Sequence, residues 1–139
     1  MDITYYGHSC FRFTERGNIS IVTDPYDESL GLGQPKPKGD IITISHDAPG
    51  HNYVDGVKGH SYVLAGPGEY EFNGVFIYGV PLHYVPTDGG EPQRNVGYVA
   101  NYGGLTVAHL GDLLHVPDQS TVEAMGEVNV ALVPVGGGG

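Results

Sequence analysis

The chain is built from short apolar runs separated by turn-forming residues, and this alternation restricts its fold more than any other feature. The runs are rich in Ile, Val, Tyr, Phe and Thr, which favour strands. The 23 Gly and 10 Pro leave little continuous sequence for helices. We therefore predict one strand-rich domain over residues 1–139, with strands at 2–6, 10–14, 19–23, 40–45, 62–65, 69–72, 75–80, 96–102, 105–109 and 128–135.

The residues between the runs predict how the strands connect. The first three strands follow one another closely and are expected to form a β-meander. Residues 40–45 are almost continuously apolar, which is typical of a strand covered on both faces. Asn73-Gly74 and Gly103-Gly104 each separate two strands, and because Asn and Gly tolerate positive φ, each pair predicts a hairpin.

One helix is expected, between residues 118 and 126. Asp118 and Ser120 are both residues that can cap its start, and Glu123 follows Ser120 at the spacing of a capping box. Gly126 is suited to end the helix. Residues 27–39 contain several Gly and Pro and are predicted to form a surface loop.

The charge balance argues against several classes of partner. Sixteen acidic and six basic residues give a formal net charge of −10, which repels nucleic acid and anionic membrane surfaces. Cys10 is the one cysteine, so no disulfide within the chain is expected. No apolar run has the length of a membrane span. These features favour a protein of the reducing cytoplasm that acts on a small molecule, with a homo-oligomer left open.

Histidine and aspartate side chains follow several of the predicted strands. His46 comes directly after the run at 40–45, His83 follows the run at 75–80, and His109 ends the run at 105–109. His51 and Asp112 lie close behind. Strand ends at one sheet edge converge, and imidazole and carboxylate groups are ligands for zinc. The pattern therefore predicts a metal site that activates water.

Five short motifs, taken in order, resemble the metallo-β-lactamase superfamily. Within it, they are most similar to bacterial metal-dependent hydrolases related to ascorbate-phosphate lactonase. The resemblance implies an α/β (α+β) αββα sandwich, of which this chain supplies the strand-rich N-terminal portion. The motifs are Gly7-His8-Ser9-Cys10-Phe11, Thr23-Asp24-Pro25-Tyr26, Ile44-Ser45-His46, Gly68-Glu69-Tyr70-Glu71 and His109-Leu110-Gly111-Asp112.

The metal-binding signature that this resemblance implies is degenerate here. The signature reads His-x-His-x-Asp-His, and its first and last histidines match His46 and His51. Ala48 stands in place of the second histidine and Gly50 in place of the aspartate, and neither has a ligating side chain. A dinuclear site is therefore not expected from this chain.

The resemblance also implies roles for residues outside the signature. His83 and Asp112 match further ligands, so one Zn or Mn ion is expected at His46, His51, His83 and Asp112. Asp112 and His51 are the residues expected to take part in catalysis. Supporting roles around the ligands are expected for Asp24, His109 and His8.

Three functions remain open at this stage. One is a hydrolase of a small ester, lactone or phosphorylated substrate with a reduced metal site. Another is a pseudoenzyme or binding module without metal, which the residues Ala48 and Gly50 favour. The third follows from the apolar run at 128–135, which stops at Gly136–Gly139. This third function is a two-chain hydrolase made by autoprocessing. A second polypeptide, starting after Gly139 with a Thr or Ser nucleophile, would complete the fold.

Overall fold

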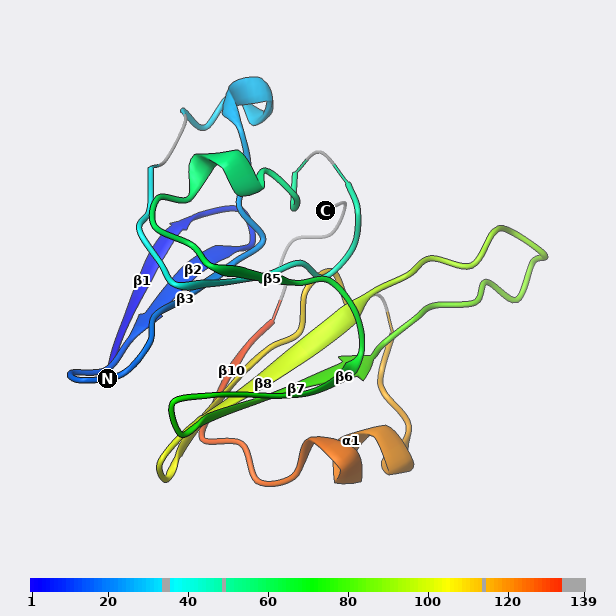
Figure 1. The fold of residues 1–139 in the computed structure, drawn as a ribbon. Helices are drawn as coiled ribbons and strands as arrows, with labels where there is room; N and C mark the ends of the chain where they lie inside the picture. Colours follow the sequence, from blue (N-terminus) through cyan, green and yellow to red (C-terminus); the bar gives the residue numbers. More distant parts are fainter. Residues whose placement is uncertain (34–35, 49, 114, 134–139) are drawn as a thin grey trace.

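The computed structural model describes residues 1–33, 36–48, 50–113 and 115–133. Two five-stranded sheets pack face to face, and the strand ribbons form two separate layers in Figure 1. The strand order is β1-β2-β3-β4-β5 in one sheet and β10-β9-β8-β7-β6 in the other. The expected two-sheet sandwich with little helix is therefore confirmed.

The first sheet combines a meander with a parallel edge. Strands β1 (Asp2–Gly7), β2 (Cys10–Thr14) and β3 (Ile21–Thr23) pair antiparallel, as predicted. Strands β4 (Ile41–Thr43) and β5 (Tyr62–Leu64) then continue the sheet parallel to β3. All three residues of β4 are buried, which agrees with the continuous apolar run at 40–45.

The second sheet is mostly antiparallel. Strands β6 (Gly68–Phe72), β7 (Val75–Pro81), β8 (Val96–Tyr102) and β9 (Leu105–His109) pair in sequence, and β10 (Val130–Leu132) joins β9 in parallel. The predicted hairpins are present, with φ of 50° and 86° at Asn73-Gly74 and 64° and 122° at Gly103-Gly104. Positive φ at both positions suits the twist of a two-residue hairpin.

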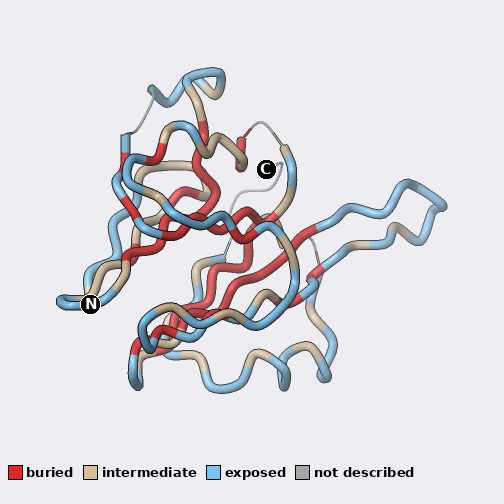
Figure 2. Tube along the Cα trace, viewed as in Figure 1, coloured by how far each residue is buried: buried red, intermediate tan, exposed pale blue. Residues whose placement is uncertain are grey.

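The main hydrophobic core lies between the sheets. Phe13, Ile21 and Ile41 meet Ile77 and residues of the facing sheet there. Figure 2 shows this buried layer as the inner stretches of the strands, with the connecting loops exposed at the rim. A second cluster lies under the loops outside the first sheet, and a third lies on the outer face of the second sheet with Met125 against it.

The helical segments are short. Helix α1 (Gln119–Met125) begins at Asp118, whose side chain accepts a hydrogen bond from the Thr121 N–H, and ends at Gly126. The predicted capping box is wrong in detail, because the Ser120 hydroxyl instead donates to the Asp118 carboxylate. One-turn 3-10 helices occupy η1 (Glu28–Leu30), within the predicted loop at 27–39, and η2 (Val54–Gly56).

The last predicted strand is only partly within the described residues. Its described part is β10, which is shorter than the predicted run at 128–135. Residues 134–139, and with them Gly136–Gly139, lie outside the described residues. Among the described residues, no helix has the length and apolar character needed to cross a membrane.

Candidate functional site

The site forms where the parallel strands β3 and β4 end next to each other. Thr23 pairs with Thr43, so Asp24, directly after β3, lies beside Ser45, two residues after β4. The backbone N–H of Asp24 donates to the Thr43 carbonyl at 2.9 Å. The chain turns sharply at Asp24, whose φ is 38°. This turn directs the Asp24 carboxylate toward the loop that follows β4.

Asp24 is fully buried and accepts three hydrogen bonds from that loop. Its Oδ1 accepts from the Ser45 N–H at 2.7 Å, and its Oδ2 accepts from the Ser45 hydroxyl at 2.6 Å. Oδ2 also accepts from Nδ1 of the buried His51 at 2.9 Å. A buried carboxylate needs such partners to offset its loss of solvation. Asp24 therefore fixes the loop that carries His46 and His51.

The contact with Asp24 determines which nitrogen of His51 carries a proton. Since the Asp24 carboxylate can only accept, Nδ1 of His51 must be the donor. In the neutral ring the other nitrogen, Nε2, then has a free lone pair. This Nε2 lies 3.1 Å from Nε2 of His8.

The protonated nitrogen of His46 is determined in the same way, through the hydroxyl of Ser45. The Ser45 hydroxyl gives its one hydrogen to Asp24, so it accepts from Nδ1 of His46, 3.0 Å away. The Nε2 lone pair of His46 then faces Asp112, whose Oδ2 lies at 3.9 Å. Burial, with a smaller contribution from nearby His51, lowers the pKa of His46. The neutral ring, which is the metal-binding form, is thereby favoured.

Asp112 reaches the site because the chain bends at Gly111. The φ of Gly111 is 60°, and a Cβ there would lie 2.4 Å from both Asn95 Oδ1 and Ser45 Cβ. Only glycine permits this approach of the β9 end to the β4 end. The Asp112 N–H donates to Asn95 Oδ1 at 3.0 Å, which holds the carboxylate beside His46.

His8 completes a row of three imidazole rings. The ring centroids of His8 and His51 are 4.7 Å apart, and those of His51 and His46 are 4.1 Å apart. Burial, followed by the effect of His51, lowers the pKa of His8. The row brings His8 next to His46 and His51, which lie about 40 residues further along the sequence.

The other two predicted histidines are placed differently. His83 is exposed, and its Nδ1 accepts the Asn95 N–H at 3.0 Å, so its neutral ring carries the proton on Nε2. His109 is buried, and Phe11 packs against it edge-on with ring centroids 5.7 Å apart. Burial lowers the pKa of His109. Thus His109 packs in the interior, and Nε2 of His83 is a hydrogen-bond donor.

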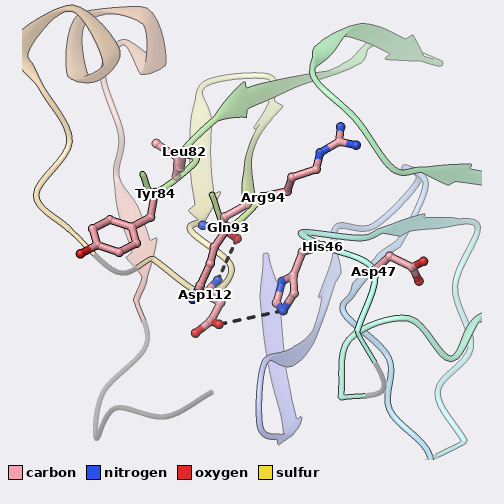
Figure 3. A pocket seen from close by; sticks show the side chains of 8 residues that line it. His46, Asp47, Leu82, Tyr84, Gln93, Arg94 and Asp112 are labelled. Atoms are coloured by element: carbon pink, nitrogen blue, oxygen red, sulfur yellow. Dashed lines mark hydrogen bonds and ion pairs between the residues drawn. The ribbon is translucent and has the colours of Figure 1, made fainter. Parts of the chain in front are cut away.

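Two adjacent hollows open beside His46. One has a volume of about 380 Å³ and lies between His46, Asp112 and the Tyr84–Asn95 region, as Figure 3 shows. The other, of about 360 Å³, lies on the side of Asn52 and Val54. His46, Asp47 and Arg94 line both hollows.

Sequence reasoning missed Arg94 and Asn95, which both contribute to the site. The loop at 86–95 contains no recognisable binding motif, so the local sequence did not identify either residue as part of a site. Asn95 directly precedes β8 and is buried although polar, a combination that often indicates a structural hydrogen-bonding role. Its Nδ2 donates to the Leu110 carbonyl at 3.0 Å, while its Oδ1 holds Asp112.

The donor chemistry of the cluster suits a metal, although its ligands are not assembled. Within the described residues, no group of three or more His, Cys, Asp and Glu side chains is arranged to hold a metal ion. However, His51 has one feature typical of a metal ligand, because its Nδ1 is bound to a carboxylate and its Nε2, which lies 3.1 Å from His8 Nε2, carries no proton in the neutral ring. His46 shares this arrangement through Ser45.

Comparison with known proteins agrees with this fold. A family model described as a beta-lactamase superfamily domain matches residues 2–139. A UPF0173 metal-dependent hydrolase of Natranaerobius thermophilus is 26% identical over 164 residues, covering 99% of this chain and 72% of the relative.

Two solved structures extend the comparison. One is a Thermotoga maritima protein named as a Zn-dependent hydrolase of the metallo-β-lactamase superfamily, with 39% identity and a TM-score of 0.74. The match covers 98% of this chain, which spans 62% of the length of that protein. The other is a Parabacteroides distasonis protein with 23% identity and a TM-score of 0.71. This match covers 96% of this chain and 69% of the Parabacteroides protein, and it supports the fold alone. The chain therefore belongs to the beta-lactamase superfamily domain family and has the metallo-β-lactamase fold.

Proposed function

We propose that this protein is a metal-dependent hydrolase in which His46, His51 and Asp112 hold one Zn or Mn ion. The observation that carries the proposal is the hydrogen bonding of Asp24, which keeps the protons of both neutral rings on Nδ1 and leaves both Nε2 atoms unprotonated. A pair of histidines needed only for packing would not require both rings in the same tautomer. The names of the relatives, which are metal-dependent hydrolases, support the same reaction class.

Each residue of the site has a distinct part in this proposal. When bound, the metal ion supplies Lewis-acid polarisation of the substrate and of water. Asp112, whose backbone N–H donates to Asn95, would orient a water molecule with its carboxylate and accept the water's proton. Asp24 and Ser45 hold the two histidine rings in position and do not touch the substrate.

His83 requires a rearrangement before it joins the ligand set. Binding through Nε2 would require the proton to move to Nδ1, and Nδ1 would then no longer accept the Asn95 N–H. Its part in the site therefore depends on release of this contact. The free Asn95 N–H would need a new acceptor at the same time.

The substrate we propose is a small ester, lactone or phosphorylated molecule with an anionic group. The net charge of −10 repels anionic molecules from the protein as a whole. Arg94, which lines both hollows next to His46, is a cation at the site itself and can attract an anionic group there. Guanidinium binds carboxylate and phosphate groups in a two-point geometry. We expect Arg94→Gln to raise KM about 10-fold or more with kcat little changed, since a remote charge contact acts on binding in both states.

The proposed function is tested by metal analysis and hydrolysis assays on the purified protein. We expect close to one equivalent of Zn or Mn by mass spectrometry, and hydrolysis of one class in a panel of nitrophenyl esters, lactones and phosphodiesters. His46→Ala should abolish turnover, whereas His60→Ala should not, because His60 bonds to the Val57 carbonyl instead. Turnover that persists after chelation would contradict the proposal.

A metal-free binding module is the second candidate, and two observations favour it. Ala48 and Gly50 replace two ligands of the signature, and the hydrogen bonds from Asp24 to His51 and on to His8 can form without an ion. In this case a small anionic ligand would bind beside Arg94 without turnover. Metal content near zero together with ligand binding would favour it.

The completion of the fold by a second polypeptide also remains a proposal, as does a homo-oligomer. Relatives are longer than the matched region, which supports further chain in the complete assembly. The intact mass of the protein expressed from its gene tests autoprocessing, since two fragments that co-purify would support a two-chain hydrolase. A single uncleaved species would exclude it.

A further inference from the structure

His8 lies against the backbone of Gly50, in the position that a side chain at residue 50 would need. A Cβ built on Gly50 would lie 2.8 Å from His8 Nε2 and 3.2 Å from His8 Cδ2. A contact of 2.8 Å is shorter than carbon and nitrogen atoms tolerate, so the His8 ring and a side chain at position 50 cannot both keep these positions and one of them must shift. The φ of Gly50 lies outside the left-handed range, so its backbone alone does not require glycine.

The turn that carries His8 adopts a costly backbone conformation. His8 has a φ of 53°, and the left-handed backbone region is unfavourable for a residue that has a side chain. The turn interrupts the regular pairing of β1 with β2, where the register shifts between Tyr5 and Gly7. The Tyr5 hydroxyl donates to the His8 carbonyl at 3.1 Å and helps to hold the turn. Strain of this kind often marks a functional position.

The strained turn places one nitrogen of His8 opposite the free lone pair of His51. Their Nε2 atoms are 3.1 Å apart, and Asp24 already holds the proton of His51 on Nδ1. Two imidazoles that bind one zinc ion at about 2.0–2.1 Å in tetrahedral geometry have nitrogens roughly 3.3 Å apart. The observed separation is therefore close to that of two ligands of one ion.

We propose that His8 and His51 bind the same divalent metal ion through their Nε2 atoms, with the His8 ring in place of the carboxylate expected at position 50. This inference rests on the proposed metal centre and adds one ligand to it. The described residues then offer four side chains of the types that zinc prefers, namely His8, His46, His51 and Asp112.

The exclusion between His8 and position 50 gives a compensation test with Zn²⁺ as the probe. Loss of a residue that only hydrogen-bonds a metal ligand weakens metal binding by ~10- to 100-fold. If His8 is itself a ligand, His8→Ala and His8→Gln should each weaken Zn²⁺ binding by more than this. His60→Ala is the matched control and should bind as the unmodified protein does. The double variant His8→Ala/Gly50→Asp should regain at least 10-fold of the lost affinity, because the vacated space admits the Asp side chain.

A second measurement separates ligation by His8 from packing. In the unmodified protein, the ¹⁵N resonance of His8 Nε2 should move on addition of Zn²⁺ together with that of His51. Zn²⁺ affinity within threefold of the unmodified protein in both His8 variants would overturn the inference and leave the proposed function standing. A double variant no tighter than His8→Ala would also count against it. An unmodified protein that binds no Zn²⁺ would instead remove the metal centre itself.

Discussion

The buried Asp24 side chain determines the orientation of several other side chains in the site. Its two oxygens accept from the Ser45 backbone, the Ser45 hydroxyl and the His51 ring, and these contacts orient His51 directly and His46 through Ser45. Because carboxylate oxygens only accept, the protons of both rings are confined to Nδ1. The chemistry of the site thus depends on a residue that is itself inaccessible to substrate.

Replacing Asp24 by asparagine should therefore change the tautomer of His51. An amide NH₂ in the place of Oδ2 would donate to Nδ1 and move the proton to Nε2, so we expect Zn²⁺ affinity to fall about 10- to 100-fold. ¹⁵N NMR of the histidine side chains reports the tautomer directly. Asp47→Asn is the control, because Asp47 is exposed and accepts from Asn52 Nδ2 at 2.6 Å. An unchanged His51 tautomer would contradict the assignment.

Cys10 illustrates a residue whose chemistry is suppressed by its surroundings. It is fully buried in the cluster with Val22 and Ile42, and burial, with a smaller effect from Asp24, raises the pKa of its thiol to about 12. The thiolate is the reactive form, so little of it exists near neutral pH. We expect the native protein at pH 8 to resist iodoacetamide over hours and the urea-unfolded protein to react in minutes, as measured by mass. Fast modification of the native protein would contradict the buried placement.

At the scale of elements, helix α1 depends on the cap that begins it. Asp118 accepts from the Thr121 N–H at 2.8 Å and from the Ser120 hydroxyl at 2.9 Å, and these bonds lower the pKa of the exposed Asp118 carboxyl. The helix covers the outer face of the second sheet through Met125, as the lower part of Figure 1 shows. Short helices have little stability of their own, so cap and packing both matter.

Asp118→Ala should accordingly lower the free energy of unfolding, because it removes the N-cap of the helix. Ser120→Ala should cost less, because Ser120 is not the residue that caps the helix. The free energy of unfolding in urea measures both. If Ser120→Ala proved the more costly of the two, the capping box predicted from the sequence would be restored.

The same scale explains which elements were predictable. Asn73-Gly74 and Gly103-Gly104 specify their hairpins locally, since their φ angles are set by residue type. The ends of β4 were less predictable, because a strand was expected over the mostly apolar run at 40–45, whereas the strand is limited to Ile41–Thr43. Ser45 leaves the strand because its N–H and hydroxyl bind Asp24, and this competition is not visible in the local sequence.

At the scale of the whole molecule, the two sheets are joined by polar contacts as well as by the apolar core. The hydroxyl of the buried Tyr98, in β8, lies 2.9 Å from both the Ile44 and the Leu64 carbonyl of the other sheet. The Val96 N–H donates to the Ser45 carbonyl at 2.8 Å. These contacts fix the position of the loop that carries His46 relative to the second sheet, which carries Asp112.

Tyr98→Phe should lower the free energy of unfolding by about 1–3 kcal/mol, because it leaves a buried carbonyl without its donor. Chemical denaturation measures this loss, and Tyr78→Phe serves as the control because Tyr78 is exposed. We also expect weaker Zn²⁺ binding in Tyr98→Phe, since the distance between His46 and Asp112 depends on how the sheets are joined. Equal stability of the two variants would show that the hydroxyl adds nothing.

The sequence by itself determined the strand-rich class, both hairpins, the meander and the family resemblance, because turn chemistry and apolar periodicity act over a few neighbouring residues. It also identified His46, His51, Asp112, Asp24 and His8 as residues of interest. Only the tertiary structure decided that Asp24 fixes the tautomers of His46 and His51, that His83 holds Asn95, and that the His8 ring fills the space above Gly50. These outcomes depend on hydrogen bonds and steric contacts between residues distant in the chain, which form only when the parallel strand ends and the facing sheet come together.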